Sequence, residues 1–128
     1  MVSFHHICQS NGRFALRQQD ANVTQSICVF AGATSGIGAA TVERLICMLH
    51  EPVFYIIGRS AKRFASQRNR LLALNPSSKI IFLEAQFSLL SDVDSACKQI
   101  VAAEEKIDYL FMSPGMIPVN GPECWLPP

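Results

Sequence analysis

Three glycines, separated by small and hydroxyl-bearing residues, form the part of this 128-residue chain best suited to hold a phosphate. They lie in the segment AGATSGIGAA (31–40), directly after the apolar run 27–30 and at the start of an amphipathic stretch. Gly32 can adopt a tight turn, Gly36 lets the backbone approach a pyrophosphate, and Gly38 lets a following helix lie close to a sheet. Free amide groups at the start of that helix would face the anion. The predicted phosphate-binding residues are Gly32, Ala33, Thr34, Ser35, Gly36, Ile37 and Gly38, with an ordinary glycine-rich loop as the alternative.

Arg59 is the second residue whose position suggests binding chemistry, because it follows the apolar run 53–57 and Gly58. In dinucleotide-binding folds, an acid near this point accepts hydrogen bonds from the ribose 2′-hydroxyl of NAD, and an arginine can instead pair with the 2′-phosphate of NADP. No acid occupies this end of the run. We therefore predict that Arg59 contacts NADP, whereas Lys62 and Arg63 are assigned to the solvated start of a helix.

The elements that would position these residues alternate between strand and helix. Four apolar runs predict strands, at 27–30, 53–57, 79–85 and 107–112. Apolar residues at helical spacing predict three helices: one ending near His50, one capped by Ser60 and ended by Asn75, and one starting at a Ser91–Asp94 capping box. Each connection is long enough for a crossover, so we expect a parallel sheet in the order 3-2-1-4. This is an α/β fold, a partial Rossmann (doubly wound) fold with three crossover helices and its ligand crevice between the first and fourth strands.

This arrangement divides the chain into three parts. Residues 24–115 form the predicted dinucleotide-binding Rossmann half-domain. Residues 1–23 form a leader segment with weak helical character around 14–16, expected to pack loosely. From Met116 onward, prolines and a glycine without periodicity predict an unstructured tail, 116–128.

Composition narrows the class of partner. A hydrophobic content of 49% and a charged content of 16% argue against disorder, and a net charge of +1 gives no reason to expect nucleic acid or an anionic membrane as partner. No apolar run approaches the roughly 18 residues of a membrane span.

The five cysteines form no CxxC pair, and three fall inside predicted apolar elements (Cys28, Cys47 and Cys97), which favours a reducing cytoplasm. His5, His6 and Cys8 lack a second cluster that would complete a metal site.

The spacing of Gly32, Gly36 and Gly38 is GxxxGxG, and together with Gly58-Arg59-Ser60, Asn75-Pro76 and Leu110 to Gly115 it resembles the short-chain dehydrogenase/reductase (SDR) family, in particular a fungal branch. The resemblance runs from the N-terminus to about Gly115. It implies an oxidoreductase that uses NADP(H) on a small carbonyl or alcohol substrate, with a setting in fungal secondary metabolism. It also implies that Gly115 lets the backbone lie close to the cofactor.

The chain departs from this family at three places. Gln86-Phe87 stands where the family has an Asp and a small apolar residue against the adenine, and Ser113-Pro114-Gly115 stands for Asn-Ala-Gly. The family's Ser and its Tyr followed four residues later by Lys have no counterpart, because Tyr55 and Tyr109 are predicted core residues of strands. We therefore predict no catalytic residue here.

The leading interpretation is a truncated NADP-dependent oxidoreductase, inactive without the missing half, with an exposed sheet edge at 107–112 through which copies associate. The alternatives are a non-catalytic dinucleotide-binding or interaction module, and a gene product without function.

Overall fold

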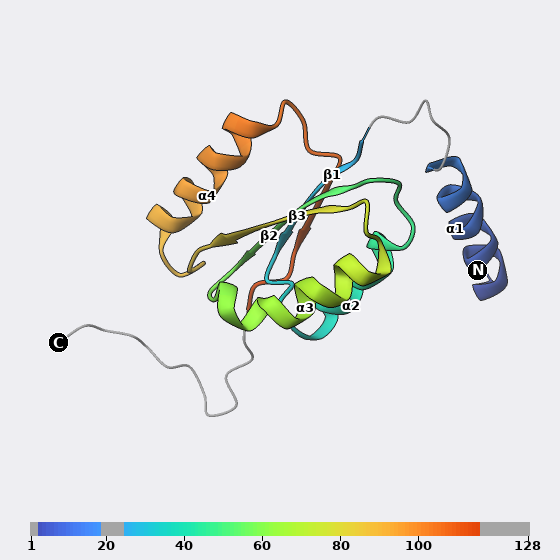
Figure 1. The fold of residues 1–128 in the computed structure, drawn as a ribbon, viewed down its shortest axis with the longest axis horizontal. Coiled ribbons are helices and arrows are strands. Elements are labelled where there is room, and N and C mark those ends of the chain that lie inside the picture. Colours follow the sequence, from blue (N-terminus) through green and yellow to red (C-terminus); the bar gives the residue numbers. More distant parts are fainter. Residues whose placement is uncertain (1–2, 19–24, 116–128) are drawn as a thin grey trace.

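The computed structural model describes residues 3–18 and 25–115, and within them a four-stranded parallel sheet carries helices on both faces (Figure 1). The elements, in chain order, are α1 (Phe4–Gln18), β1 (Ile27–Ala31), α2 (Gly36–Ile46), β2 (Val53–Gly58), α3 (Ala61–Leu74), β3 (Lys79–Glu84), α4 (Leu90–Ala103) and β4 (Tyr109–Met112). The strand order is β3-β2-β1-β4. This confirms the predicted order and the three crossover helices α2, α3 and α4.

Successive side chains along each strand point to opposite faces of the sheet, and they form two apolar clusters, one on each face. Phe30 and Phe54 point to the face covered by α2 and α3, where they pack with Val42, Ile46 and Phe64. The intervening residues of the same strands, such as Val29 and Tyr55, point to the face covered by α4 and pack with Ala96 and Ile100. Because both faces of β1 and β2 are covered, these strands are buried along their whole length, as expected for near-continuous apolar sequences.

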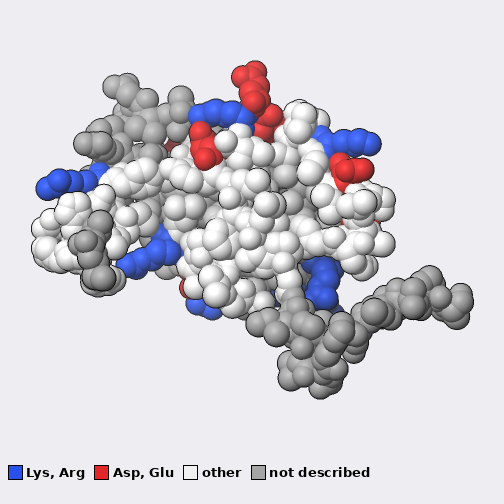
Figure 2. All heavy atoms as spheres, turned by 180° about the vertical axis from the view of Figure 1, so that it is seen from behind, with Lys and Arg blue, Asp and Glu red and all other residues white. Residues whose placement is uncertain are grey.

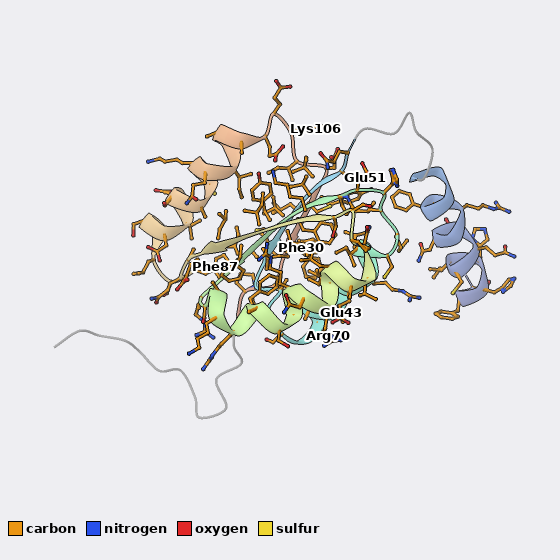
Figure 3. All side chains as sticks on the ribbon, in the orientation of Figure 1. Phe30, Glu43, Glu51, Arg70, Phe87 and Lys106 are labelled. Carbon is orange, nitrogen blue, oxygen red and sulfur yellow. The ribbon has the colours of Figure 1, made fainter. Side chains whose placement is uncertain are left out.

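Polar contacts join the helices on the α2–α3 face. The side chain of Arg70 on α3 forms an ion pair of 2.9 Å with Glu43 on α2, on the outside of the layer that covers Phe30 (Figure 3). The side-chain amide of Asn75, just after α3, donates to the carbonyl oxygens of Ile46 and Leu49 at 3.0 and 3.1 Å. Asn75 therefore both ends α3, as predicted, and satisfies carbonyl groups at the end of α2.

Two helix boundaries differ from the prediction. α2 ends at Ile46 and not near His50, although Leu49 is still buried in the turn that follows. The predicted Ser91–Asp94 capping box is wrong, because α4 already begins at Leu90 and places Ser91 inside the helix. Asp92 supplies the carboxylate here: it accepts a hydrogen bond of 3.0 Å from the backbone N–H of Gln86 and so holds the loop from β3 to α4.

Exposure also differs from the prediction for several side chains. Cys47 and Cys97 are exposed, so of the three cysteines expected in the core only Cys28 is buried. Tyr109 is 37% exposed, although it lies in β4 as predicted, because β4 forms an edge of the sheet in the described residues. At the N-terminal side, α1 is a helix of 15 residues where only weak helical character was expected. The predicted tail lies outside the described residues.

Candidate cofactor site

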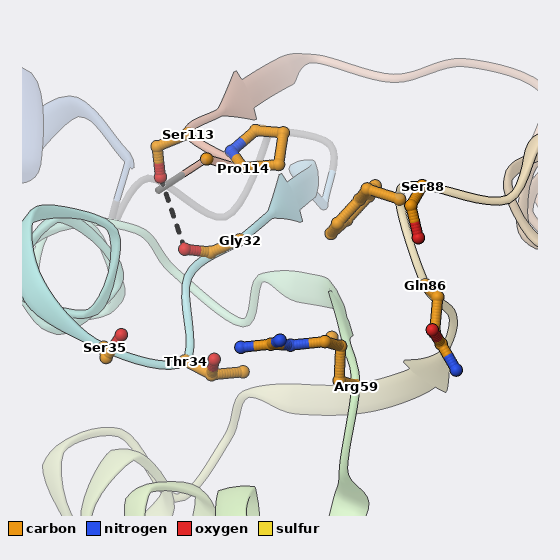
Figure 4. Close-up of a pocket in the computed structure, with 11 residues that line it drawn as sticks. Gly32, Thr34, Ser35, Arg59, Gln86, Ser88, Ser113 and Pro114 are labelled. Carbon is orange, nitrogen blue, oxygen red and sulfur yellow. Dashed lines mark hydrogen bonds between the residues drawn. The ribbon is translucent and has the colours of Figure 1, made fainter. Parts of the chain in front are cut away.

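A cavity of about 360 Å³ lies at the carboxyl ends of the strands, at the switch point between β1 and β4 (Figure 4). Each strand contributes the residues that follow it, so segments far apart in the sequence meet at one edge. The residues that line the cavity are Gly32, Thr34 and Ser35 after β1, Gly58 and Arg59 at the end of β2, Gln86, Phe87 and Ser88 after β3, and Ser113, Pro114 and Gly115 after β4.

The turn after β1 is built around Gly32. Its φ of +80° is a backbone conformation that residues with a Cβ rarely adopt. A Cβ at this position would also lie 2.8 Å from the Pro114 nitrogen and 2.8 Å from the Ser113 carbonyl carbon and oxygen. The Ser113 hydroxyl donates to the Gly32 carbonyl oxygen at 3.3 Å (Figure 4). Glycine is therefore required here by its dihedral angle and by the close approach of the chain leaving β4.

The other two glycines place the start of α2. Gly38 is buried, and a Cβ on it would lie 2.8 Å from the Ala33 Cα and 2.9 Å from the Gly32 carbonyl oxygen, so the helix lies directly on the turn. Gly36 has a φ of +58° and open space where its Cβ would be. Within the described residues, the Ser35 side chain forms no capping hydrogen bond with the first turn of α2. The amide groups of that turn, with the positive end of the helix dipole, are thus available to an anion.

Arg59 supplies the charge of the cavity. It is the single charged residue among those that line the cavity in the described part of the chain, and it is exposed. Its guanidinium extends from the end of β2 into the cavity on the side of Thr34 (Figure 4). Gly58, just before it, is packed against Thr34, because a Cβ there would lie 2.8 Å from the Thr34 Cγ2. Contact between the ends of β1 and β2 therefore keeps Arg59 beside the glycine turn.

The structure brings five of the nine predicted site residues into the cavity wall: Gly32, Thr34, Ser35, Arg59 and Gly115. The other four lie close by in the chain but outside this wall. Ala33 is fully buried, Gly36 and Gly38 shape the helix start, and Ile37 is 80% exposed on α2.

Six lining residues were not predicted as binding residues: Gly58, Gln86, Phe87, Ser88, Ser113 and Pro114. Their position directly after strands of a parallel sheet is the signal that could have identified them, since all such ends meet at one edge.

The two tyrosines of the described residues lie away from this cavity. Tyr55 is buried in β2 and its hydroxyl donates to the Glu104 carboxylate at 2.7 Å. Burial, with the neighbouring Glu104, raises the pKa of Tyr55 to about 12. Neither Tyr55 nor Tyr109 lines the cavity.

In residues 3–18 and 25–115 there is no group of three or more His, Cys, Asp or Glu side chains that could hold a metal ion. No helix in these residues is long and apolar enough to cross a membrane.

Comparison with known proteins identifies curated relatives that are similar to this chain. No protein-family model matches the chain. The chain is 44% identical over 101 residues to the curated protein "Oxidoreductase lepF" of Aspergillus flavus, an alignment covering 79% of this chain and 28% of that protein. This chain thus spans less than a third of the length of the curated relatives that it matches.

Solved structures share the fold. One is L-sorbose reductase from Gluconobacter frateurii complexed with NADPH and L-sorbose, with a TM-score of 0.64, 18% identity, and coverage of 76% of this chain and 36% of that one. Another is YwfH, described as an NADPH-dependent reductase involved in bacilysin biosynthesis, with a TM-score of 0.62, 22% identity, and coverage of 68% and 34%. Together, these matches show that the chain is similar to one segment of fungal oxidoreductases and has the fold of part of a short-chain dehydrogenase/reductase.

Proposed function

We propose that this chain forms the NADP(H)-binding part of a short-chain oxidoreductase that interconverts a small carbonyl compound and an alcohol. The observation that carries the proposal is the placement of Arg59, a cation, in the same cavity wall as the Gly32 turn and beside the start of α2. A helix start and a glycine turn suit a pyrophosphate, and an arginine at the end of the second strand suits a 2′-phosphate. One structural neighbour is an NADPH-dependent reductase and another was solved in complex with NADPH, which supports the same cofactor.

The residues present fit this cofactor. Gly32 has no side chain to block the approach of a ligand, the first turn of α2 has amide groups that Ser35 does not cap, and Gly36 has open space around it. Ligand pockets in proteins run from about 300 to 1,000 Å³, so a cavity of about 360 Å³ suits part of a dinucleotide. We assign to it the phosphate-bearing adenosine half.

Each of these site residues then has a proposed role in binding the cofactor. The amide groups from Ser35 to Gly38 would hold the pyrophosphate, and Arg59 would pair with the 2′-phosphate. Gln86 replaces the usual adenine-contacting carboxylate and would offer an amide in its place. Ser113 would keep the Gly32 turn in position through its hydrogen bond to the turn carbonyl. When bound, the cofactor supplies or accepts the hydride.

We further propose that the chain alone does not turn over substrate. Its sequence contains two tyrosines, and neither is followed four residues later by a lysine. Loss of a general acid lowers an enzymatic rate by about 10² to 10⁴-fold. The same observation favours a second candidate, a non-catalytic dinucleotide-binding module. Restoration of hydride transfer by a full-length relative supplied in trans would support the oxidoreductase, whereas cofactor binding without restored transfer would support the module.

The charges on one face of the molecule suit a small-molecule ligand better than nucleic acid. On the face drawn in Figure 2, basic and acidic side chains are interspersed and form no continuous basic surface. We propose NADP(H) as the principal partner, self-association through the β4 edge as a second interaction, and the reducing cytoplasm as the compartment.

Titration of the chain with NADPH and NADH, followed by cofactor fluorescence, tests the cofactor assignment. Charge-assisted hydrogen bonds contribute about 1.5 to 3 kcal/mol, so we expect NADPH to bind at least about tenfold more tightly than NADH. Arg59→Ala should abolish this preference. Arg63→Ala is the matched control, because Arg63 is also basic and close to β2 but lies outside the cavity wall. Equal affinity of the unmutated chain for the two cofactors would contradict the assignment.

A further inference from the structure

A second cavity, of about 250 Å³, lies between α1 and α2 and holds two cysteines. Cys8, Asn11 and Gly12 line it from α1, and Arg44, Cys47 and Met48 line it from α2 and the turn after it. On each side the three residues follow helical spacing, at positions i, i+3 and i+4, so each helix presents one stripe to the other. The two thiols come from residues 39 positions apart, and the fold brings them to one cavity.

Both thiols are reduced and accessible. Cys8 and Cys47 are free and exposed, and the Cys47 thiol donates to the Glu43 carbonyl oxygen at 3.3 Å, within its own helix. Arg44 provides a cation in the wall of the same cavity. A thiolate, the anionic form, is the species that reacts with oxidants.

The described side chains of α1 lie mostly at the surface. Its side chains from residue 3 to residue 13 are exposed, and Phe14 packs, half-buried, against the cluster beneath α2 and α3. A helix whose described side chains are mostly exposed moves at little free-energy cost. A disulfide requires Cα atoms within about 7 Å, so α1 and α2 must meet that distance when the bond forms.

We propose that Cys8 and Cys47 are a redox-sensitive thiol pair that joins α1 to α2 when the chain meets a peroxide. One thiolate attacks an oxygen of hydrogen peroxide, the O–O bond breaks, and a sulfenic acid and hydroxide form. The second thiol attacks the sulfenic sulfur, the S–S bond forms, and the hydroxyl group leaves as water. Two thiols and one peroxide thus give one disulfide and two waters, and the two electrons pass from sulfur to peroxide.

The disulfide would attach α1 to α2, the helix that begins at the glycine turn. Cys47 is the C-terminal cap residue of α2, and Gly36 is its first residue. A disulfide between Cys8 and Cys47 closes a long loop that includes β1 and the whole turn, which restricts the unfolded chain. Oxidation is therefore expected to raise the melting temperature by several degrees. Transient disulfides of this kind are the form found in reducing compartments.

The test is oxidation of the full chain at low micromolar concentration with a stoichiometric amount of hydrogen peroxide. Free thiols are then blocked with N-ethylmaleimide, and the chain is digested without reduction and mapped by mass spectrometry. We expect a peptide pair joined through Cys8 and Cys47, with Cys97 and Cys124 recovered in the blocked form. Cys8→Ser and Cys47→Ser should each abolish the link, and Cys97→Ser, an exposed cysteine on α4, should leave it intact.

Oxidation of the unfolded chain is a control for the role of the fold. In urea, the same oxidation should lose its selectivity among the cysteines, because the fold no longer brings Cys8 and Cys47 together. A link between either of these residues and another cysteine in the folded chain would overturn the proposal. So would separate over-oxidation of Cys8 and Cys47 without a disulfide, or a yield that depends on protein concentration and thus reflects bonds between molecules.

Discussion

β2 and β4 pair with β1 in parallel, one on each side of it, yet they lie in opposite environments. Both sequences are apolar, VFYIIG and YLFM, but every residue of β2 is buried, and in β4 only Phe111 is half-buried. The tyrosines show the difference directly: Tyr55 of β2 is 3% exposed and Tyr109 of β4 is 37% exposed. Helices on both faces and β3 on the far side enclose β2, whereas β4 forms an edge in the described residues. An apolar run predicts a strand, and the neighbouring elements decide whether that strand is covered.

The largest expected difference between the two strands is in their contribution to stability. Ile56→Ala on β2 removes a fully buried side chain, and such changes cost about 2 to 5 kcal/mol. Leu110→Ala on β4 removes a side chain that is 59% exposed, so we expect a loss of less than about 1 kcal/mol. Urea unfolding at low protein concentration, followed by circular dichroism, measures both. Equal losses would mean that β4 is covered in solution as fully as β2.

A smaller effect is expected where β4 leaves the sheet and meets the turn after β1. Gly32→Ala places a Cβ against the backbone of Ser113 and Pro114 and forces alanine into a positive φ, a strain of about 1 to 3 kcal/mol. Gly12→Ala is the control, because Gly12 lies within α1 with nothing within 4 Å of a new Cβ. That change should instead stabilise the chain by about 0.5 to 1 kcal/mol. If the two variants unfold at the same denaturant concentration, the close approach at Gly32 is not a constraint.

The third effect concerns association through the uncovered strand. Copies that pair through the β4 edge would bury Leu110, so Leu110→Lys should weaken self-association at least tenfold, or about 1.4 kcal/mol. Glu84→Lys on β3 is the control, because that edge already carries exposed Lys79 and Glu84 at its ends and should not associate. Sedimentation velocity over a concentration series measures the change. A chain that stays monomeric before mutation, or an equal response of both variants, would exclude the β4 edge as the interface.

The smallest expected effect is a loss of stability that appears only in alkaline solution. Burial raises the pKa of Tyr55 from 10.0 to about 12, and it raises the pKa of Cys28 from 9.0 to about 12. The unfolded chain therefore releases these protons first, so the free energy of unfolding should fall as the pH rises from about 9 to 12. Tyr55→Phe should reduce the fall more than Tyr109→Phe, since the Tyr109 ring is partly exposed. Unfolding curves between pH 8 and 11 that show no decline would contradict this assignment.

The sequence was sufficient for the features that depend on local chemistry. Alternating elements predicted the strand order, Ser60 was predicted as a cap and accepts from the Arg63 amide at 3.4 Å, and Gly32 was predicted as the turn glycine. Features set by distant contacts were missed. The start of α4 depends on Asp92 holding the backbone N–H of Gln86, and the exposure of Tyr109 depends on what lies beside β4. Ser88 and Ser113 join the cavity because the strand ends converge, so the signal for them is their position after predicted strands and not the residue types around them.

The central claim, that the cavity between the ends of β1 and β4 holds NADP(H), is tested most directly by hydrogen–deuterium exchange with and without NADPH. We expect slower exchange in peptides that contain 32–38 and Arg59, because bound phosphates would accept hydrogen bonds from the amides of the first turn of α2 and order the end of β2. Peptides from α1 should exchange at the same rate in both samples, and Arg59→Ala should remove the protection at the concentration that protects the unmutated chain. Unchanged exchange in 32–38 at saturating NADPH, or protection confined to the cavity between α1 and α2, would contradict the claim.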